Sequence, residues 1–343
     1  MRRFALGLRD VVLVLFAGLL VCFSGCPTPT GNSPDSPTGK IEIDGSSTVF
    51  KLTQAIAEEF RADNAGVQIK VDKSGTGGGF KNFVLGKLDI CDASRPIAKN
   101  EMEQCQANGV EYIELPTAFD AITVAVNIQN TWCDAMTVAE LKKLWEPEAE
   151  GKIIKWKQIR DKWPDAKIEL YGQGHDSGTF EYFTEAIVKQ KNKSRTDCTA
   201  SEDDNVILLG IEGDKGALGY VPYAYFAPRA GKTMKAVKID SGNGPVVPSP
   251  QTVKDASYKP LSRPLFIYVN RKAADRPEVK QFVEFYLQNG EKMAEVVGYI
   301  PLNGSDYPKV LERFHKLQIG TSFGGESSEG KTLDDILSAP PAA

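Results

Sequence analysis

Short β-type runs alternate with amphipathic, helix-like stretches, and this alternation restricts the possible folds more than any other feature of the chain. The runs IEI (41–43), VQIKV (67–71) and LDI (88–90) are each followed by a stretch with helical spacing of apolar residues. Such alternation is typical of an α/β fold. Two longer β-rich runs, AITVAVN (121–127) and PLFIYVN (264–270), bracket a second α/β set. We therefore expect two α/β lobes joined by a hinge of two crossing strands.

The two predicted lobes are not continuous along the chain. Lobe I comprises residues 40–120 plus 266–320, and lobe II comprises residues 121–265. A chain of 343 residues, 41% hydrophobic and 25% charged, is long enough for two globular domains. The tail, residues 321–343, is polar, and we expect it to be loose.

The N-terminus carries the features of an export signal. Basic residues precede an apolar run at 11–23, which is too short to span a bilayer comfortably. Small residues directly before Cys26 resemble a bacterial lipobox, so residues 1–26 are interpreted as a lipoprotein signal peptide. The alternative is an ordinary cleaved signal with an incidental cysteine. Residues 27–40 have no apolar face and read as a flexible tether. The predicted location is the periplasm or the outer face of the cytoplasmic membrane, with a lipid anchor at Cys26.

Four cysteines remain beyond the signal and Cys26: Cys91, Cys105, Cys133 and Cys198. An even number in an exported chain suggests two disulfides, for which three connectivities exist. We favour Cys91–Cys105 and Cys133–Cys198, because each pair then lies within one predicted lobe. Metal ligation is the weaker interpretation, since no C-x₂-C pair occurs and the chain has only two histidines. No metal and no cofactor are expected.

Four clusters of hydroxyl residues and glycine stand where a loop should enter a helix. They are GSSTVF (45–50), SGTGGGF (74–80), DASRP (92–96) and HDSGTF (175–180). A helix N-terminus offers unpaired N–H donors, and glycine lets an oxyanion approach the backbone closely. Simple capping and turns would explain any single cluster. Four together predict a cage of donors for one small anion.

The overall charge of the chain excludes some partners. The formal net charge is −4, so an anion must be held by local geometry and not by a broad positive field. Nucleic acid is not expected to bind. Arg95 is the only arginine in the four clusters, and its planar fork suits one edge of an oxyanion. The alternative role for Arg95 is a salt bridge at the surface or between the two lobes.

Two sequence patterns typical of enzymes occur in the chain, but the surrounding sequence does not support either one. GESSEGKT (325–332) satisfies the phosphate-loop pattern but lies in an acidic terminal segment instead of between a core strand and a full helix. A hydrolase would start from His175 and Ser177, but residues two apart cannot easily form a nucleophile–base hydrogen bond. His315 is the only other histidine, in the last predicted helix. We therefore predict that the protein is not an enzyme.

With these residues in view, the chain resembles the substrate-binding protein of the bacterial phosphate ABC importer, a type II periplasmic binding protein. The resemblance runs from about residue 40 to 325. It rests on DGSSTVF (44–50), SGTGGG (74–79), DASRPI (92–97), MTVAELKKLWEP (136–147), DSGTF (176–180), EDDN (202–205), GALGY (216–220), SRPLF (262–266) and GYIPL (298–302).

The resemblance implies a function and a set of partners. In that family two lobes close over inorganic phosphate and then dock on the membrane permease of the importer. It implies a monomer that binds phosphate by hydrogen bonds alone, without catalysis or cofactor. The alternatives are another tetrahedral oxyanion, such as sulfate, and, from another class, a phosphate-ester hydrolase or a sensor domain.

The resemblance also implies the ligands of the phosphate. They fall on Thr48, the N–H of Val49, Thr76, Gly77, Ser177, Gly178 and Thr179. Two positions depart from the family pattern. Arg95 stands where an aspartate is usual, and Gln173 stands where an arginine is usual. Arg95 is therefore expected to supply the positive charge of the site, and Asp176 is the nearest candidate for the missing carboxylate.

Overall fold

The computed structural model describes residues 37–175, 177–326, 328 and 331–338. The predicted signal peptide, Cys26 and residues 27–36 of the predicted tether lie outside the described residues, and so does Asp176. Across the described ranges, no helix has the length and apolar character that a membrane span requires.

A parallel set of strands forms one half of the main sheet, in the order β2-β1-β3. The strands are β1 (Gly39–Gly45), β2 (Val67–Val71) and β3 (Ile90–Ala93). The helices that follow them are α1 (Ser47–Asp63), α2 (Thr76–Phe83) and α3 (Lys99–Asn108). Helix α1 forms as expected from the spacing of its apolar residues, because Val49, Leu52, Ile56 and Phe60 all lie on its buried face.

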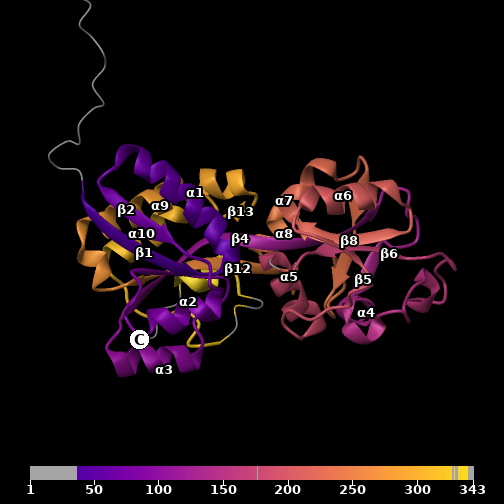
Figure 1. Cartoon of the computed structure of the whole chain (residues 1–343), viewed down its shortest axis with the longest axis horizontal. Helices are drawn as coiled ribbons and strands as arrows, with labels where there is room; N and C mark the ends of the chain where they lie inside the picture. The colour runs from indigo at the N-terminus through magenta and orange to yellow at the C-terminus, as the bar shows by residue number, and fades with distance from the viewer. Residues whose placement is uncertain (1–36, 176, 327, 329–330, 339–343) are drawn as a thin grey trace, which may run out of the picture. The chain divides into compact units, whose positions relative to one another are not determined.

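Two strands lie where the two halves of the sheet meet, β4 (Tyr112–Asn127) and β12 (Ser262–Asn270). The first part of β4 pairs with β12 in antiparallel register, from Tyr112 opposite Asn270 to Ala121 opposite Ser262. From Ile122 onward β4 pairs instead with β8 (Ala217–Pro222). Figure 1 shows these strands running between the two sets of strands and helices. The predicted α/β fold with two crossing strands is confirmed.

The other half of the sheet continues from β4 in the order β8-β6-β7, with β6 (Glu169–Gln173) and β7 (Thr199–Ser201). A small separate sheet contains β5 (Ala135–Thr137), β10 (Lys238–Asp240) and β11 (Pro245–Val246). The remaining elements of this region are β9 (Met234–Ala236), α4 (Val138–Trp145), α5 (Gly178–Phe183), α6 (Asp204–Gly213), α7 (Tyr223–Phe226) and α8 (Pro250–Lys254).

The chain returns to the first half of the sheet after β12. Helix α9 (Pro277–Val297) packs against α1, and β13 (Ile300–Pro301) pairs with β4. Helices α10 (Tyr307–His315) and α11 (Leu333–Ser338) follow. This return agrees with a first lobe interrupted by a second, although the lobe boundaries themselves stay a prediction.

The described part of the tail is packed, which corrects the expectation that it is loose. Phe323 is 3% exposed and Ile336 is fully buried, both in one apolar cluster with residues of α2 and β12. The buried carboxylate of Glu114 accepts hydrogen bonds from the Thr321 hydroxyl and the Ser322 N–H. The polar composition of the segment led to the wrong expectation. A few buried apolar side chains and one buried hydrogen-bond acceptor are enough to keep the segment packed.

The two predicted disulfides are not formed, which corrects the sequence interpretation. Cys91, Cys105, Cys133 and Cys198 are all free thiols. The first three are buried among apolar side chains, and Cys198 packs against the edge of the core. A buried free cysteine behaves as a small apolar residue. The even count of cysteines therefore reflects packing and not cross-linking.

Candidate anion-binding site

The first hydroxyl cluster joins β1 to α1 and lies against the end of β3. A Cβ atom on Gly45 would lie 2.1 Å from the carbonyl oxygen of Asp92, so only glycine allows this close approach. Ser46 caps α1 by accepting the N–H of Val49 at 3.4 Å. Thr48 follows in the first turn and is buried. The tight packing of this loop places the first donors beside the DASRP segment.

The second and third clusters meet through hydroxyl groups. The oxygen atoms Oγ1 of Thr76 and Oγ of Ser94 are 3.1 Å apart, and the N–H of Ser94 donates to Thr76 Oγ1. A Cβ atom on Gly79 would lie 2.6 Å from the Cα atom of Gly45, so the first turn of α2 touches the first cluster. Glycine is required at these contacts because backbone meets backbone.

The fourth cluster approaches the first from the other half of the sheet. A Cβ atom on Gly178 would lie 2.6 Å from Thr48 Oγ1 and 2.9 Å from Ser47 Oγ. Ser177 Oγ donates to Gln173 Oε1 at 2.9 Å and accepts the N–H of Thr179 at 3.2 Å. All four clusters therefore meet at one place, although 130 residues of sequence separate Thr48 from Gly178.

Arg263 is the charged residue that the sequence interpretation missed. It lies on β12, is 9% exposed, and donates through Nη2 to Thr48 Oγ1 at 3.1 Å and to Asp120 Oδ2 at 3.4 Å. Its guanidinium carbon is 3.7 Å from the centroid of the Tyr182 ring. Its Nε is buried and has no hydrogen-bond partner among the described residues. The sequence did contain a feature that could have pointed to Arg263. In SRPLF (262–266) an arginine stands inside an apolar strand, where a buried charge needs a partner.

Asp120 accompanies this arginine on the neighbouring strand β4. Burial raises the pKa of the Asp120 carboxyl, whereas the charges of Arg263 and Lys51 act in the opposite direction. The pair is almost fully enclosed, with 10% of the Arg263 side chain and 3% of the Asp120 side chain exposed. The two crossing strands thus bring a buried cation and a buried carboxyl to the meeting point of the clusters.

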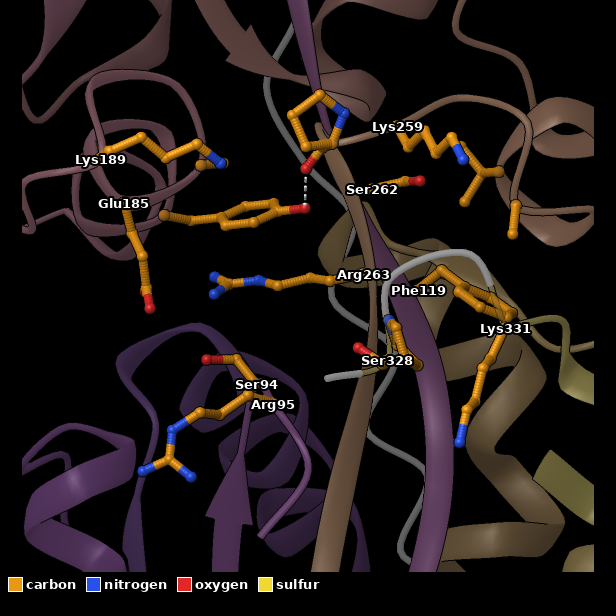
Figure 2. A pocket seen from close by; sticks show the side chains of 16 residues that line it. Ser94, Arg95, Phe119, Glu185, Lys189, Lys259, Ser262, Arg263, Ser328 and Lys331 are labelled. Carbon is orange, nitrogen blue, oxygen red and sulfur yellow. Dashed lines mark hydrogen bonds between the residues drawn. The ribbon is translucent and has the colours of Figure 1, made fainter. Parts of the chain in front are cut away.

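Arg95 lies near the same place, but its charge is already paired. Its Nη1 and Nη2 donate to the two carboxylate oxygens of Glu101 at 2.8 and 2.7 Å, and Nη1 also donates to the Pro96 carbonyl. Figure 2 shows the guanidinium of Arg95 turned away from Arg263. The fork that was expected to hold an anion therefore holds a carboxylate in this structure.

The carboxyl of Asp92, in the third cluster, contacts the middle of α1. Asp92 is fully buried, and its carboxyl accepts the hydroxyl proton of Thr53. Burial raises the pKa of Asp92 to about 8, against the lowering effect of the Thr53 hydrogen bond. Burial thus favours the neutral form of this carboxyl, and Asp92 is not assigned as an acceptor for the ligand.

A pocket of about 220 Å³ adjoins the meeting point. Arg263 and Ser94 form part of its wall, together with Tyr182, whose hydroxyl donates to the Pro260 carbonyl. Figure 2 shows Arg263 extending across the middle of this pocket. Over the ranges that the structure describes, no group of three or more His, Cys, Asp and Glu side chains could hold a metal ion.

The fold and the converging donor loops define a binding protein of the type II periplasmic class. The model of the PBP superfamily domain matches residues 30–289. The chain belongs to this superfamily and, within it, to the PstS family of phosphate-binding proteins. The predicted family resemblance is confirmed.

Individual relatives cover most of the chain. Protein SphX of Synechocystis sp. is 49% identical over 326 residues, which are 95% of each protein. Phosphate-binding protein PstS of Staphylococcus aureus is 34% identical over 298 residues, covering 86% of this chain and 88% of that protein. The crystal structure of "a possible phosphate binding protein" from Planctomyces limnophilus is 44% identical with a TM-score of 0.78, and covers 82% of this chain and 99% of that one.

Proposed function

We propose that the protein binds inorganic phosphate outside the cytoplasm and delivers it to the membrane permease of an ABC importer. The observation that carries this proposal is the convergence of four donor-rich loops on one place beside the buried Arg263. The PstS relative is named a phosphate-binding protein, which supports the same ligand. That relative is named as a binding protein and not as an enzyme, so the proposed role is capture and transfer and not catalysis.

The ligand is proposed to be held by neutral donors together with one cation. The neutral donors are Thr48, Val49, Thr76, Gly77, Ser177, Gly178 and Thr179. We assign the cation to Arg263, because its Nε lacks a described partner and its Nη2 already contacts Thr48. Arg95 is assigned a smaller part, because both of its terminal nitrogens donate to Glu101. Preorganised donors in a buried site favour an oxyanion more than the same groups in water.

Calorimetric titration tests the proposed function directly. The mature protein is expected to bind one phosphate per chain, to bind arsenate at the same site, and to bind sulfate more weakly. Arsenate shares the tetrahedral shape and the proton of phosphate, whereas sulfate has no proton to donate at neutral pH. Tighter binding of sulfate than of phosphate would identify a sulfate-binding protein instead. Heat from neither anion would contradict the proposed function.

The preference for phosphate over sulfate is expected to depend on a carboxylate. An ionised carboxylate only accepts hydrogen bonds, so it favours a protonated anion and repels one without a proton. Asp176→Asn should reduce the ratio of phosphate to sulfate affinity about tenfold, since a charge-assisted hydrogen bond contributes about 1.5–3 kcal/mol. Asp120→Asn is the comparison, because Asp120 lies beside Arg263. If only Asp120→Asn lost the preference for phosphate over sulfate, the carboxylate that accepts the phosphate proton would be Asp120 on β4.

Closure of the two halves on the ligand is expected to require Gly178. A methyl group there would lie within 3.0 Å of the hydroxyl oxygens of Ser47 and Thr48. Gly178→Ala should weaken phosphate binding about tenfold, because overpacking costs roughly 1–3 kcal/mol. Small-angle scattering should show a smaller decrease in radius on adding phosphate than for the wild type. Gly213→Ala, where the added methyl meets nothing within 4 Å, is the control. Equal affinity of both variants would contradict closure at Gly178.

The location and the partners follow from the proposed transport role. We propose that residues 1–26 direct export, that Cys26 carries a lipid anchor, and that residues 27–38 tether the binding unit to the membrane surface. This tether is two residues shorter than the one expected from the sequence, because Gly39 and Lys40 belong to β1. The protein is proposed to act as a monomer, because one chain contains all four donor loops. Its partners are then phosphate, the permease subunits and the membrane that holds the anchor.

A further inference from the structure

The pocket beside the donor loops is strongly basic. Five basic side chains and one acidic side chain line it: Arg95, Lys189, Lys259, Arg263, Lys331 and Glu185. Two of these charges are already balanced, since Arg95 pairs with Glu101 and Arg263 pairs with Asp120. Lys189 and Lys259 form no ion pair or side-chain hydrogen bond with any residue in the described ranges. The pocket therefore retains an excess of positive charge.

The wall of this pocket is continuous with the proposed phosphate site. Arg263 belongs to the wall and donates to Thr48, and Ser94 belongs to the wall and donates to Thr76. In Figure 2, Ser94 lies on one side of Arg263 and Lys189 lies on the other. The pocket wall thus includes a residue of the third donor loop, Ser94, and the arginine that contacts the first donor loop, Arg263.

The backbone on the far side of the pocket has uncommon conformations. Lys189 and Ala256 have φ angles of +63° and +57°, values that non-glycine residues rarely adopt. Glu185 and Ala186 belong to a π-helical turn, Thr184–Val188. Such features have an energetic cost and are found disproportionately at functional sites. Lys189 is the left-handed residue that ends this π-helical turn, so the turn and the lysine belong to one local structure at the pocket wall.

We propose that this pocket holds a second anionic group of the same ligand, so that the protein also binds condensed phosphates, with inorganic pyrophosphate as the simplest. This inference rests on the proposed phosphate site. One phosphoryl group lies against the donor loops, and the second lies in the pocket beside Arg263, near Lys189 and Lys259. Glu185 is the one acidic side chain in the lining, and it opposes the second group.

Calorimetric titration of the full mature chain with pyrophosphate and with phosphate, in metal-free buffer, tests this inference. Wild type should bind one pyrophosphate, which phosphate displaces. The double variant Lys189→Gln/Lys259→Gln should lose at least tenfold in pyrophosphate affinity and less than twofold in phosphate affinity. The double variant Lys157→Gln/Lys162→Gln removes the same charge from exposed positions outside the pocket lining and should leave both affinities unchanged.

A variant that removes a negative charge from the pocket is expected to have the opposite effect on pyrophosphate affinity. Glu185→Gln should strengthen pyrophosphate binding severalfold, because the one acidic side chain of the lining is removed, and should leave phosphate affinity within twofold. The inference is overturned if pyrophosphate does not bind, or if the lysine variant loses both ligands equally. It is also overturned if that variant keeps wild-type pyrophosphate affinity. Failure of phosphate itself to bind the wild type would instead refute the proposed function.

Discussion

Arg263→Met is expected to weaken phosphate binding at least tenfold. The variant keeps an apolar stem over the Tyr182 ring but removes the cation whose Nη2 contacts Thr48. A hydrogen bond to a charged group contributes about 1.5–3 kcal/mol, and about 1.4 kcal/mol corresponds to tenfold in affinity. Arg263→Lys should recover only part of the loss, because a point charge cannot reproduce the planar fork. Calorimetric titration of the three proteins measures the effect.

Arg95→Ala is the matched comparison for this prediction. Arg95 donates to Glu101 with both terminal nitrogens, so its removal should cost less phosphate affinity than the removal of Arg263. The double variant Arg263→Met/Asp120→Asn checks folding, because it removes the buried carboxyl that Arg263→Met leaves without its cation. If Arg95→Ala loses phosphate binding while Arg263→Met binds as the wild type does, then the charge of the site belongs to Arg95, as the sequence analysis predicts.

Trp145→Ala is expected to reduce the free energy of unfolding by about 3–5 kcal/mol, the range for a buried aromatic residue replaced by alanine. Trp145 is 1% exposed, and its ring meets the rings of Phe183 and Tyr220 edge-on at 5.6 and 5.0 Å. These three side chains join α4, α5 and β8 behind the fourth donor loop. Removal leaves a cavity that so crowded a cluster cannot fill by small shifts.

Urea unfolding followed by circular dichroism measures this loss. Leu209→Ala is the control, because Leu209 is 64% exposed and its truncation should change stability by no more than about 0.5 kcal/mol. Added phosphate should still stabilise Trp145→Ala, since Trp145 is not among the proposed ligands. A loss below about 1 kcal/mol, in the range of an ordinary substitution, would show that the cluster repacks around the gap.

Local sequence patterns predicted the α/β fold and the donor loops because both depend on short-range spacing. The apolar residues of α1 recur with the helical period. The glycine and hydroxyl residues of 45–50 and 74–80 suit a loop that joins a strand to a helix, whatever the rest of the chain does. The expectations drawn from the cysteine count and from the polar tail were wrong, because they concern long-range contacts that short-range spacing does not determine. Whether Cys91 is cross-linked or Phe323 is packed depends on neighbours distant in the chain.

Read alone, the sequence was sufficient to show the order of strands and helices. It also predicts the export signal and the four loops as donors to an anion. It could not assign the partners of its charges. Arg95 and Arg263 look alike as letters, yet one faces Glu101 six residues away and the other faces Thr48 and Asp120, 215 and 143 residues away. An arginine is available to a ligand only where the folded chain leaves part of its fork without a partner. That depends on the crossing of β4 and β12, which brings distant residues within hydrogen-bond distance.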